Sequence, residues 1–131
     1  MIERYTNPEM GNIWSDQAKY QTWLDVEIAA CEANCKLGKI PQSAMETIRT
    51  KARFKPERIL EIEEEVRHDV IAFLTNVNEY VGDAGRYVHV GMTSSDVLDT
   101  GLALQLKSSV KLVRKELLLL EEAIRDLARQ H

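Results

Sequence analysis

The last third of the chain carries the pattern that most constrains its fold. Six apolar residues recur there in steps of three and four: Val110, Val113, Leu117, Leu120, Ile124 and Leu127. This spacing predicts a long α-helix with a coiled-coil-like apolar seam. A helix over residues 95–131 would extend ~50 Å, whereas a compact domain of this size is only ~30 Å across. We therefore expect the helix to reach beyond the domain that carries it.

More than one face of this helix needs a partner. Leu112, Leu118 and Leu119 lie off the seam, and neither Gly nor Pro ends the pattern before His131. We expect the chain to be the first part of a longer protein, in which later helices or other subunits cover these faces. The alternative is an autonomous helical domain that dimerises through this helix.

Short-range signals predict helices in the rest of the chain. Ser15 is a candidate N-cap, followed by Asp16 in the first turn, where the helix dipole favours an anion. Gly38 is expected to end that helix. Three prolines are expected to open helices: Pro8, Pro41 and Pro56.

The remaining predicted helices cover residues 42–52, 56–65 and 69–81. Loops are expected around Gly82 and Gly85 and over residues 91–96. Neither strand alternation nor an internal repeat is visible. The sequence predicts an all-α fold, in which a small helical domain over residues 1–94 leads into a long helix over residues 95–131.

Composition excludes several classes of partner. The net charge of −4 argues against a broad nucleic-acid surface. No apolar run approaches the ~20 residues of a membrane span, and the N-terminus lacks the apolar core of a signal peptide. We therefore expect a cytoplasmic protein without nucleic-acid or membrane partners.

The chain has two cysteines, Cys31 and Cys35, which their spacing puts on one helix face. A disulfide or half of a metal site is one reading of this pair. Two buried thiols that act as small hydrophobic side chains are the reading that a reducing cytosol favours.

Two polar constellations could bind a ligand. Arg4 offers a forked donor for phosphate or carboxylate, and Tyr5 adds a hydroxyl and a ring; the alternative is a surface ion pair and a packed ring. Arg67, His68 and Asp69 lie between an acidic helix and an apolar one. A histidine exchanges a proton near neutral pH, although a solvated or structural role is the alternative for His68.

The third constellation is residues 91–96, with the sequence GMTSSD. Glycine before hydroxyl side chains at a helix start is typical of an anion cradle, because backbone N–H groups and the helix dipole face the site. Thr93, Ser94 or Ser95 could instead serve only as the N-cap. Asp96 is expected to interact with the helix dipole, since its carboxylate would repel an anionic substrate.

Together these segments resemble the adenylosuccinate lyase family. The resemblance rests on residues 2–10 (IERYTNPEM) and 13–15 (IWS), on residues 67–70 (RHDV) and on residues 88–97 (VHVGMTSSDV). The last segment is similar to a motif shared by the wider fumarase/aspartase superfamily, and the three together are specific to the smaller family. The resemblance covers essentially the whole chain.

The resemblance implies roles for individual residues. Arg4 and Tyr5 would bind the nucleotide part of the substrate. Arg67, His68 and Asp69 would line the same site, with His68 holding or polarising the substrate near the leaving group. Thr93 and Ser94 would bind a carboxylate of the succinyl moiety, later fumarate. Ser95 is assigned the helix cap, and His89 lies close to the site without an assigned step.

The implied reaction is β-elimination of fumarate from adenylosuccinate, giving AMP, and from the succinylated aminoimidazole carboxamide ribotide of purine biosynthesis. The family requires neither a metal nor an organic cofactor. Its members are homotetramers whose sites form between three subunits around a central helical bundle. Residues 95–131 would begin one bundle helix.

The chain departs from the family's full pattern in two places. The general-acid histidine lies in a Gly-Arg-Thr-His-Gly type segment, and the general-base serine in a Gly-Ser-Ser-x-Met-Pro loop; neither occurs in this sequence. The chain alone is therefore expected to be inactive. Alternatives are another superfamily lyase, acting on argininosuccinate or a cycloisomerase-like substrate, and a non-enzymatic module that pairs through the long helix.

Overall fold

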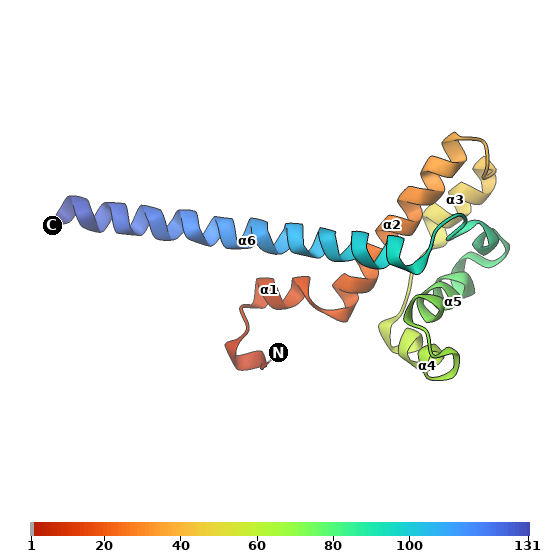
Figure 1. Cartoon of the computed structure of the whole chain (residues 1–131), viewed down its shortest axis with the longest axis horizontal. Coiled ribbons are helices and arrows are strands. Elements are labelled where there is room, and N and C mark those ends of the chain that lie inside the picture. The colour runs from red at the N-terminus through yellow and green to blue at the C-terminus, as the bar shows by residue number, and fades with distance from the viewer. Residues whose placement is uncertain (1) are drawn as a thin grey trace.

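The computed structural model describes residues 2–131 (Figure 1). In chain order the elements are η1 (Glu3–Tyr5), α1 (Pro8–Ile13), α2 (Asp16–Lys36), α3 (Gln42–Lys51), α4 (Pro56–Val66), α5 (Asp69–Val81), η2 (Gly82–Tyr87) and α6 (Ser94–Gln130). Every described element is helical, so the all-α prediction is confirmed. Helices α2 to α5 gather into one helical domain, from which α6 projects as a single straight rod (Figure 1).

Local capping explains where most helices begin. The Ser15 Oγ accepts a hydrogen bond of 3.1 Å from the Ala18 N–H at the start of α2. Pro8 and Pro56 occupy the first positions of α1 and α4, where a missing N–H costs nothing. Gly38 follows the end of α2 with a φ of +71°, a conformation that glycine adopts without strain. These predicted boundaries are confirmed.

An aromatic cluster forms the centre of the helical domain. Tyr20 and Trp23 of α2 meet Phe73 of α5, and all three are buried. The Tyr20 ring stacks on Phe73 with centroids 6.0 Å apart, and Trp23 meets Phe73 edge-on at 5.5 Å. Such pairs contribute about 1 kcal/mol each beyond their burial, so this cluster fixes the angle between α2 and α5.

Helix α6 begins on this core and then leaves it. Val97 is fully buried, and Gly101 packs where an added Cβ would lie 2.8 Å from Cδ1 of Trp23. One turn further, Nε2 of Gln105 donates a hydrogen bond of 2.8 Å to the Ile13 carbonyl. Beyond this point α1 runs beside α6 (Figure 1).

The apolar seam and its off-seam leucines are largely uncovered in this chain. Val110, Leu117, Leu120 and Ile124 are each more than half exposed. A shallow apolar groove lies between α1 and α6, lined on one side by Met10. The expected excess of apolar surface is therefore present on α6.

Two local predictions were wrong in detail. The segment expected as a loop around Gly82 and Gly85 is a 3-10 helix, η2, in which Gly85 lies so close to the side chain of Asn78 that a Cβ would not fit. Of the two free cysteines, Cys31 is buried but Cys35 is only half-buried. Burial raises the pKa of the Cys31 thiol to about 11.

Over residues 2–131, none of the helices has the length and apolar character needed to cross a membrane.

Candidate functional site

Arg4 and Tyr5 lie in η1, at the edge of the molecule. Both are exposed, Tyr5 to 74%. The Arg4 guanidinium lies over the Tyr5 ring, 4.8 Å from its centroid. Neither side chain is held by the core, so this pair is free to reach a ligand.

The turn between α4 and α5 carries Arg67, His68 and Asp69. Arg67 ends α4 in the left-handed conformation, with a φ of +54°. His68 is the N-cap of α5, and its Nδ1 accepts a long hydrogen bond of 3.4 Å from the Ile71 N–H. That nitrogen also lies 3.5 Å from Oδ1 of Asp69, so these neighbouring side chains do approach each other.

This cap determines which nitrogen of neutral His68 carries the proton. Because Nδ1 accepts from the Ile71 N–H, the proton resides on Nε2. The ring is about half exposed, with 46% of the side chain accessible. His68 therefore presents a hydrogen-bond donor outward from the start of α5.

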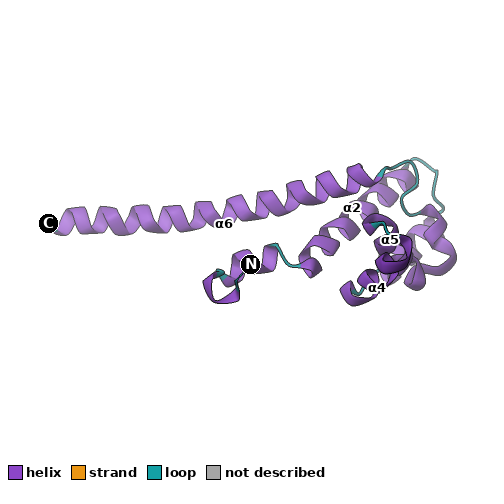
Figure 2. Ribbon diagram, turned by 60° about the horizontal axis from the view of Figure 1, so that its bottom comes forward, coloured by secondary structure: helices purple, strands orange, loops and turns teal. Residues whose placement is uncertain are grey.

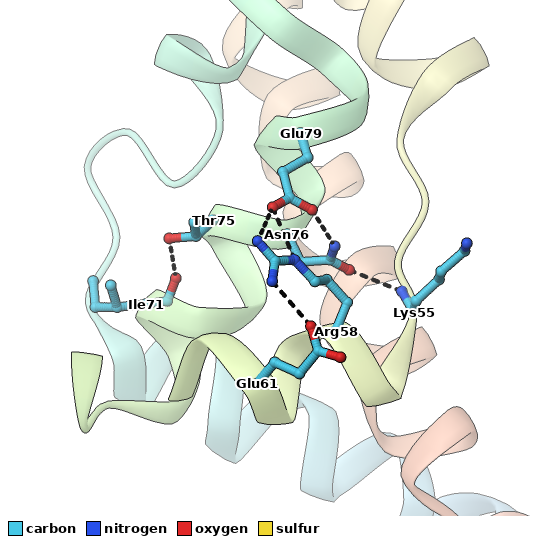
Figure 3. A network of polar contacts seen from close by, with 7 residues as sticks. All are labelled: Lys55, Arg58, Glu61, Ile71, Thr75, Asn76 and Glu79. Atoms are coloured by element: carbon cyan, nitrogen blue, oxygen red, sulfur yellow. Dashed lines mark hydrogen bonds and ion pairs between the residues drawn. The ribbon is translucent and has the colours of Figure 1, made fainter. Parts of the chain in front are cut away.

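A polar network anchors the other end of the α4–α5 pair (Figure 3). The buried Asn76 accepts a hydrogen bond of 2.8 Å from the Lys55 N–H and donates one of 2.9 Å to Glu79. Arg58 then bridges Glu79 and Glu61. The Arg58 guanidinium lowers the pKa of Glu79, and Glu79 in turn raises the pKa of Arg58. The network fixes α4 against α5 and so helps to fix the turn at their far end.

The loop before α6 contains the candidate anion cradle. Gly91 has a φ of +78°. Thr93 is the extended N-cap of α6, and its N–H donates a hydrogen bond of 2.8 Å to Oδ2 of Asp96. Ser94 opens the helix. Asp96 therefore lies in the first turn, as predicted, and one of its oxygens is bound to the backbone.

The assignment of Ser95 as the cap was wrong. Thr93 precedes Asp96 by three residues, which is the spacing at which a cap and the third helical residue can bond reciprocally. Ser95 instead lies within the first turn of α6 and is exposed.

The most buried polar contact of this region, between Glu27 and His89, was not predicted from the sequence. Glu27 of α2 is 1% exposed. Its Oε2 accepts a hydrogen bond of 2.9 Å from the His89 N–H, and its Oε1 lies 2.6 Å from Nδ1 of His89. Burial raises the pKa of Glu27, while the contacts with His89 act in the opposite direction. No local signal could reveal this pair, because its members are 62 residues apart.

Two of the three predicted groups of binding residues, Arg67–Asp69 and Thr93–Ser94, lie next to the same hydrophobic core. Val70 directly follows Asp69, and Val97 directly follows residues 91–96. Both are fully buried in the same core cluster, and Met92 packs against it. Arg4 and Tyr5 are not part of this grouping: η1 lies towards the middle of α6, away from α4 and α5 (Figures 1 and 2). Within residues 2–131 no group of three or more His, Cys, Asp or Glu side chains is arranged to hold a metal ion.

Comparison with known proteins identifies the family. The profile of a family described as "Lyase" matches residues 3–131. The chain belongs to this lyase family. The chain is 69% identical over 131 residues to the adenylosuccinate lyase of Synechocystis sp. and 47% identical over 134 residues to that of Aquifex aeolicus.

These relatives match 100% of this chain, whereas the chain spans only 30% and 31% of their lengths. Among solved structures, a fumarate lyase from Mesorhizobium sp. BNC1 matches with a TM-score of 0.85 and 28% identity, over 95% of this chain and 30% of that chain. The resemblance to adenylosuccinate lyases is therefore confirmed along the whole sequence.

Proposed function

We propose that this chain supplies substrate-binding groups to an adenylosuccinate lyase. The full-length enzyme would release fumarate from adenylosuccinate, giving AMP, and from the succinylated aminoimidazole carboxamide ribotide in purine biosynthesis. The 69% identity to the Synechocystis adenylosuccinate lyase over the whole chain is the observation that carries this proposal. The cytoplasm would be its compartment.

The elimination sets clear demands on the site. A base removes a proton from the carbon beside a carboxylate, the C–N bond breaks, and its electron pair leaves with the nitrogen, which an acid protonates. Negative charge accumulates on the carboxylate during the first step, so hydrogen-bond donors must already face it. Thr93 and Ser94, at the start of α6, would supply these donors.

The other constellations would bind the nucleotide part. Arg67 would contact the phosphate or base, and Asp69 would line the same site. Arg4 and Tyr5 of η1, which lie away from the α4–α5 turn within one chain, would join such a site from another subunit of the homotetramer. His68 would donate from Nε2 to the substrate near the leaving group, in keeping with its cap to the Ile71 N–H. No metal and no organic cofactor enters this scheme.

The two parts of the chain would serve different purposes in the assembled enzyme. Residues 1–94 would form the N-terminal helical domain, and residues 95–131 would begin a helix of the central bundle in a homotetramer. The exposed leucines of α6 support this arrangement, because apolar faces of this extent need partner helices. Lacking the general acid and general base, residues 1–131 alone would be inactive.

Fumarate release tests the proposal directly. The full-length lyase that contains this chain should release fumarate from adenylosuccinate and not from argininosuccinate, and it should bind AMP in preference to arginine. Absence of release from adenylosuccinate at every pH from about 6 to 9, the range in which histidine-assisted proton transfer operates, would refute it.

The hydroxyl groups of the cradle allow a sharper test. Thr93→Ala combined with Ser94→Ala should lower kcat at least 100-fold, because each lost donor to transition-state charge costs on the order of 3 kcal/mol. The matched control is Thr47→Ala combined with Thr50→Ala on α3, whose hydroxyls bond only to carbonyls of their own helix. The control should retain full activity, whereas equal activity in both pairs would favour a non-enzymatic helical module.

A further inference from the structure

Glu27 is the one charged residue buried in the described part of the chain; the other buried polar residues are Asn76 and Gln105. Both of its carboxylate oxygens contact the same residue, His89. The proposed roles of Arg4, Tyr5, Arg67–Asp69 and Thr93–Ser94 do not involve this pair. Burying a carboxylate is costly unless it is fully hydrogen-bonded, so the pair calls for an explanation other than packing.

The backbone of His89 is held in an unfavourable conformation. Its φ is +66°, in the left-handed region that costs an ordinary residue about 1–2 kcal/mol. The His89 carbonyl then accepts a hydrogen bond of 3.3 Å from the Met92 N–H, which closes the turn that leads to Thr93. Glu27 binds the His89 N–H at the start of this turn, so it stabilises the strained residue from α2.

Glu27 also determines how the His89 ring is protonated. A carboxylate only accepts hydrogen bonds, so Nδ1, 2.6 Å away, carries a proton. Nε2 is then a lone-pair acceptor in the neutral ring and a donor in the cation. This nitrogen makes no hydrogen bond within residues 2–131, and 19% of the side chain is exposed. The ring therefore keeps one oriented polar atom available to a ligand.

We propose that Glu27 is a positioning residue for substrate: it holds the His89 turn that leads into Thr93 and Ser94, and it orients the His89 ring so that Nε2 contacts the bound substrate. This inference rests on the proposed lyase function. A buried carboxylate that fixes the tautomer of an imidazole can matter greatly to rate without itself touching the substrate, as in the serine protease triad.

Glu27→Gln in the full-length lyase is the principal test. The amide has one accepting and one donating end, so it cannot accept from both the backbone N–H and Nδ1 of His89. We expect kcat to fall at least about 10-fold, as for a misassigned imidazole tautomer, while KM changes less than threefold and the thermal midpoint and assembly are retained. Glu32→Gln is the matched control, since Glu32 lies on the same helix in a solvent-accessible pair with Arg49.

A double-mutant cycle with His89→Asn shows whether Glu27 acts through His89. Asparagine tolerates a left-handed φ, so the turn is retained while the imidazole is removed. We expect Glu27→Gln to change kcat less than threefold in this background, because the ring it would misorient is already gone. Additive losses, or a parallel loss of stability, kcat and KM, would show a structural role and overturn the inference.

If Glu27→Gln does not assemble, Glu27→Asp takes its place. Aspartate keeps the charge, but its side chain is one methylene shorter and reaches His89 less well. We therefore expect kcat to fall in the wild-type background and to change less than threefold in the His89→Asn background. An assembled Glu27 variant with wild-type kcat would overturn the inference while leaving the lyase function intact. A wild-type enzyme that releases no fumarate would overturn both.

Discussion

His68 and His89 each lie in a short segment between helices, but different parts of the molecule hold their rings. Nδ1 of His68 has two long contacts, 3.4 Å to the Ile71 nitrogen and 3.5 Å to Asp69 Oδ1, both within three residues of it. Nδ1 of His89 has one short contact of 2.6 Å, to a carboxylate 62 residues away. The His68 side chain is 46% exposed and the His89 side chain 19%.

This difference separates an adaptable ring from a fixed one. Neither contact of His68, with the Ile71 N–H or with Asp69, is short enough to hold the ring tightly. His89 cannot move away from Glu27 without leaving a buried carboxylate unpaired, which costs several kcal/mol. We infer that the His68 ring can adjust its orientation to a ligand, whereas the His89 ring keeps its orientation.

Removing the buried carboxylate should have the largest effect. Glu27→Ala leaves the His89 N–H and ring without partners and opens a cavity between α2 and the loop before α6. We therefore expect the free energy of unfolding, measured by urea denaturation, to fall by about 3 kcal/mol. Glu32→Ala, which removes a solvent-accessible ion pair with Arg49, should cost less than about 1 kcal/mol. Equal losses would mean that the Glu27 contact is no stronger than a surface pair.

The His68 turn should depend next on the network at the far end of α4 and α5. Asn76→Leu removes the acceptor of the Lys55 N–H and the donor to Glu79, and we expect it to cost about 2 kcal/mol for the unsatisfied groups. Thr75→Ala, at an exposed position of α5 where the hydroxyl bonds only to the Ile71 carbonyl, is the control. Amide hydrogen exchange should show faster exchange at Lys55 in Asn76→Leu only; unchanged protection there would contradict the role assigned to Asn76.

Loss of the His68 ring itself should be milder. His68→Ala removes the N-cap of α5 and should lower the free energy of unfolding by about 0.5–1 kcal/mol. His68→Asn should restore most of this stability, because Asn is a preferred N-cap, but it should not restore kcat. A loss as large as that of Glu27→Ala would abolish the distinction between the two turns.

The smallest expected effect is a pH dependence at Glu27. Burial raises its folded-state pKa above the ordinary value of 4.5, so the folded state holds the proton more tightly than the unfolded state. The resulting stabilisation is complete below pH 4.5 and is lost as the pH rises through the raised pKa. The difference in unfolding free energy between wild type and Glu27→Gln should therefore change between pH 4.5 and the raised pKa of Glu27. A difference that does not depend on pH would contradict a raised pKa.

Sequence patterns predicted those features that depend on residues within one or two helical turns of each other. The Ser15 cap, the prolines at the starts of α1 and α4, and the whole of α5 follow from such signals. The α4–α5 turn and the loop before α6 also follow from such signals, whereas the binding roles of their residues were predicted from the resemblance alone. The Ser95 assignment failed because three neighbouring hydroxyls compete for one cap, and the choice depends on Asp96 reaching back to the Thr93 N–H.

Contacts between distant segments could not be predicted in this way. Glu27 occurs in α2 among other charged residues, and only the packing of α2 against the loop before α6 brings it to His89. The contact of Asn76 with the Lys55 N–H also depends on how α4 and α5 pair. Burial of one carboxylate among many acidic residues has no signature in a single sequence.

The close contact between Gly101 and Trp23 makes α6 a lever arm. The stretch from Gly101 to Gln130 extends about 43 Å, so a tilt of about 5° at the glycine would displace its far end by about 4 Å. A methyl group at position 101 would meet Trp23 and Thr22 at 2.8–3.0 Å, and the helix would have to swing to relieve it. Whatever packs along the far half of α6 thus has its alignment set by a single missing side chain near the aromatic core.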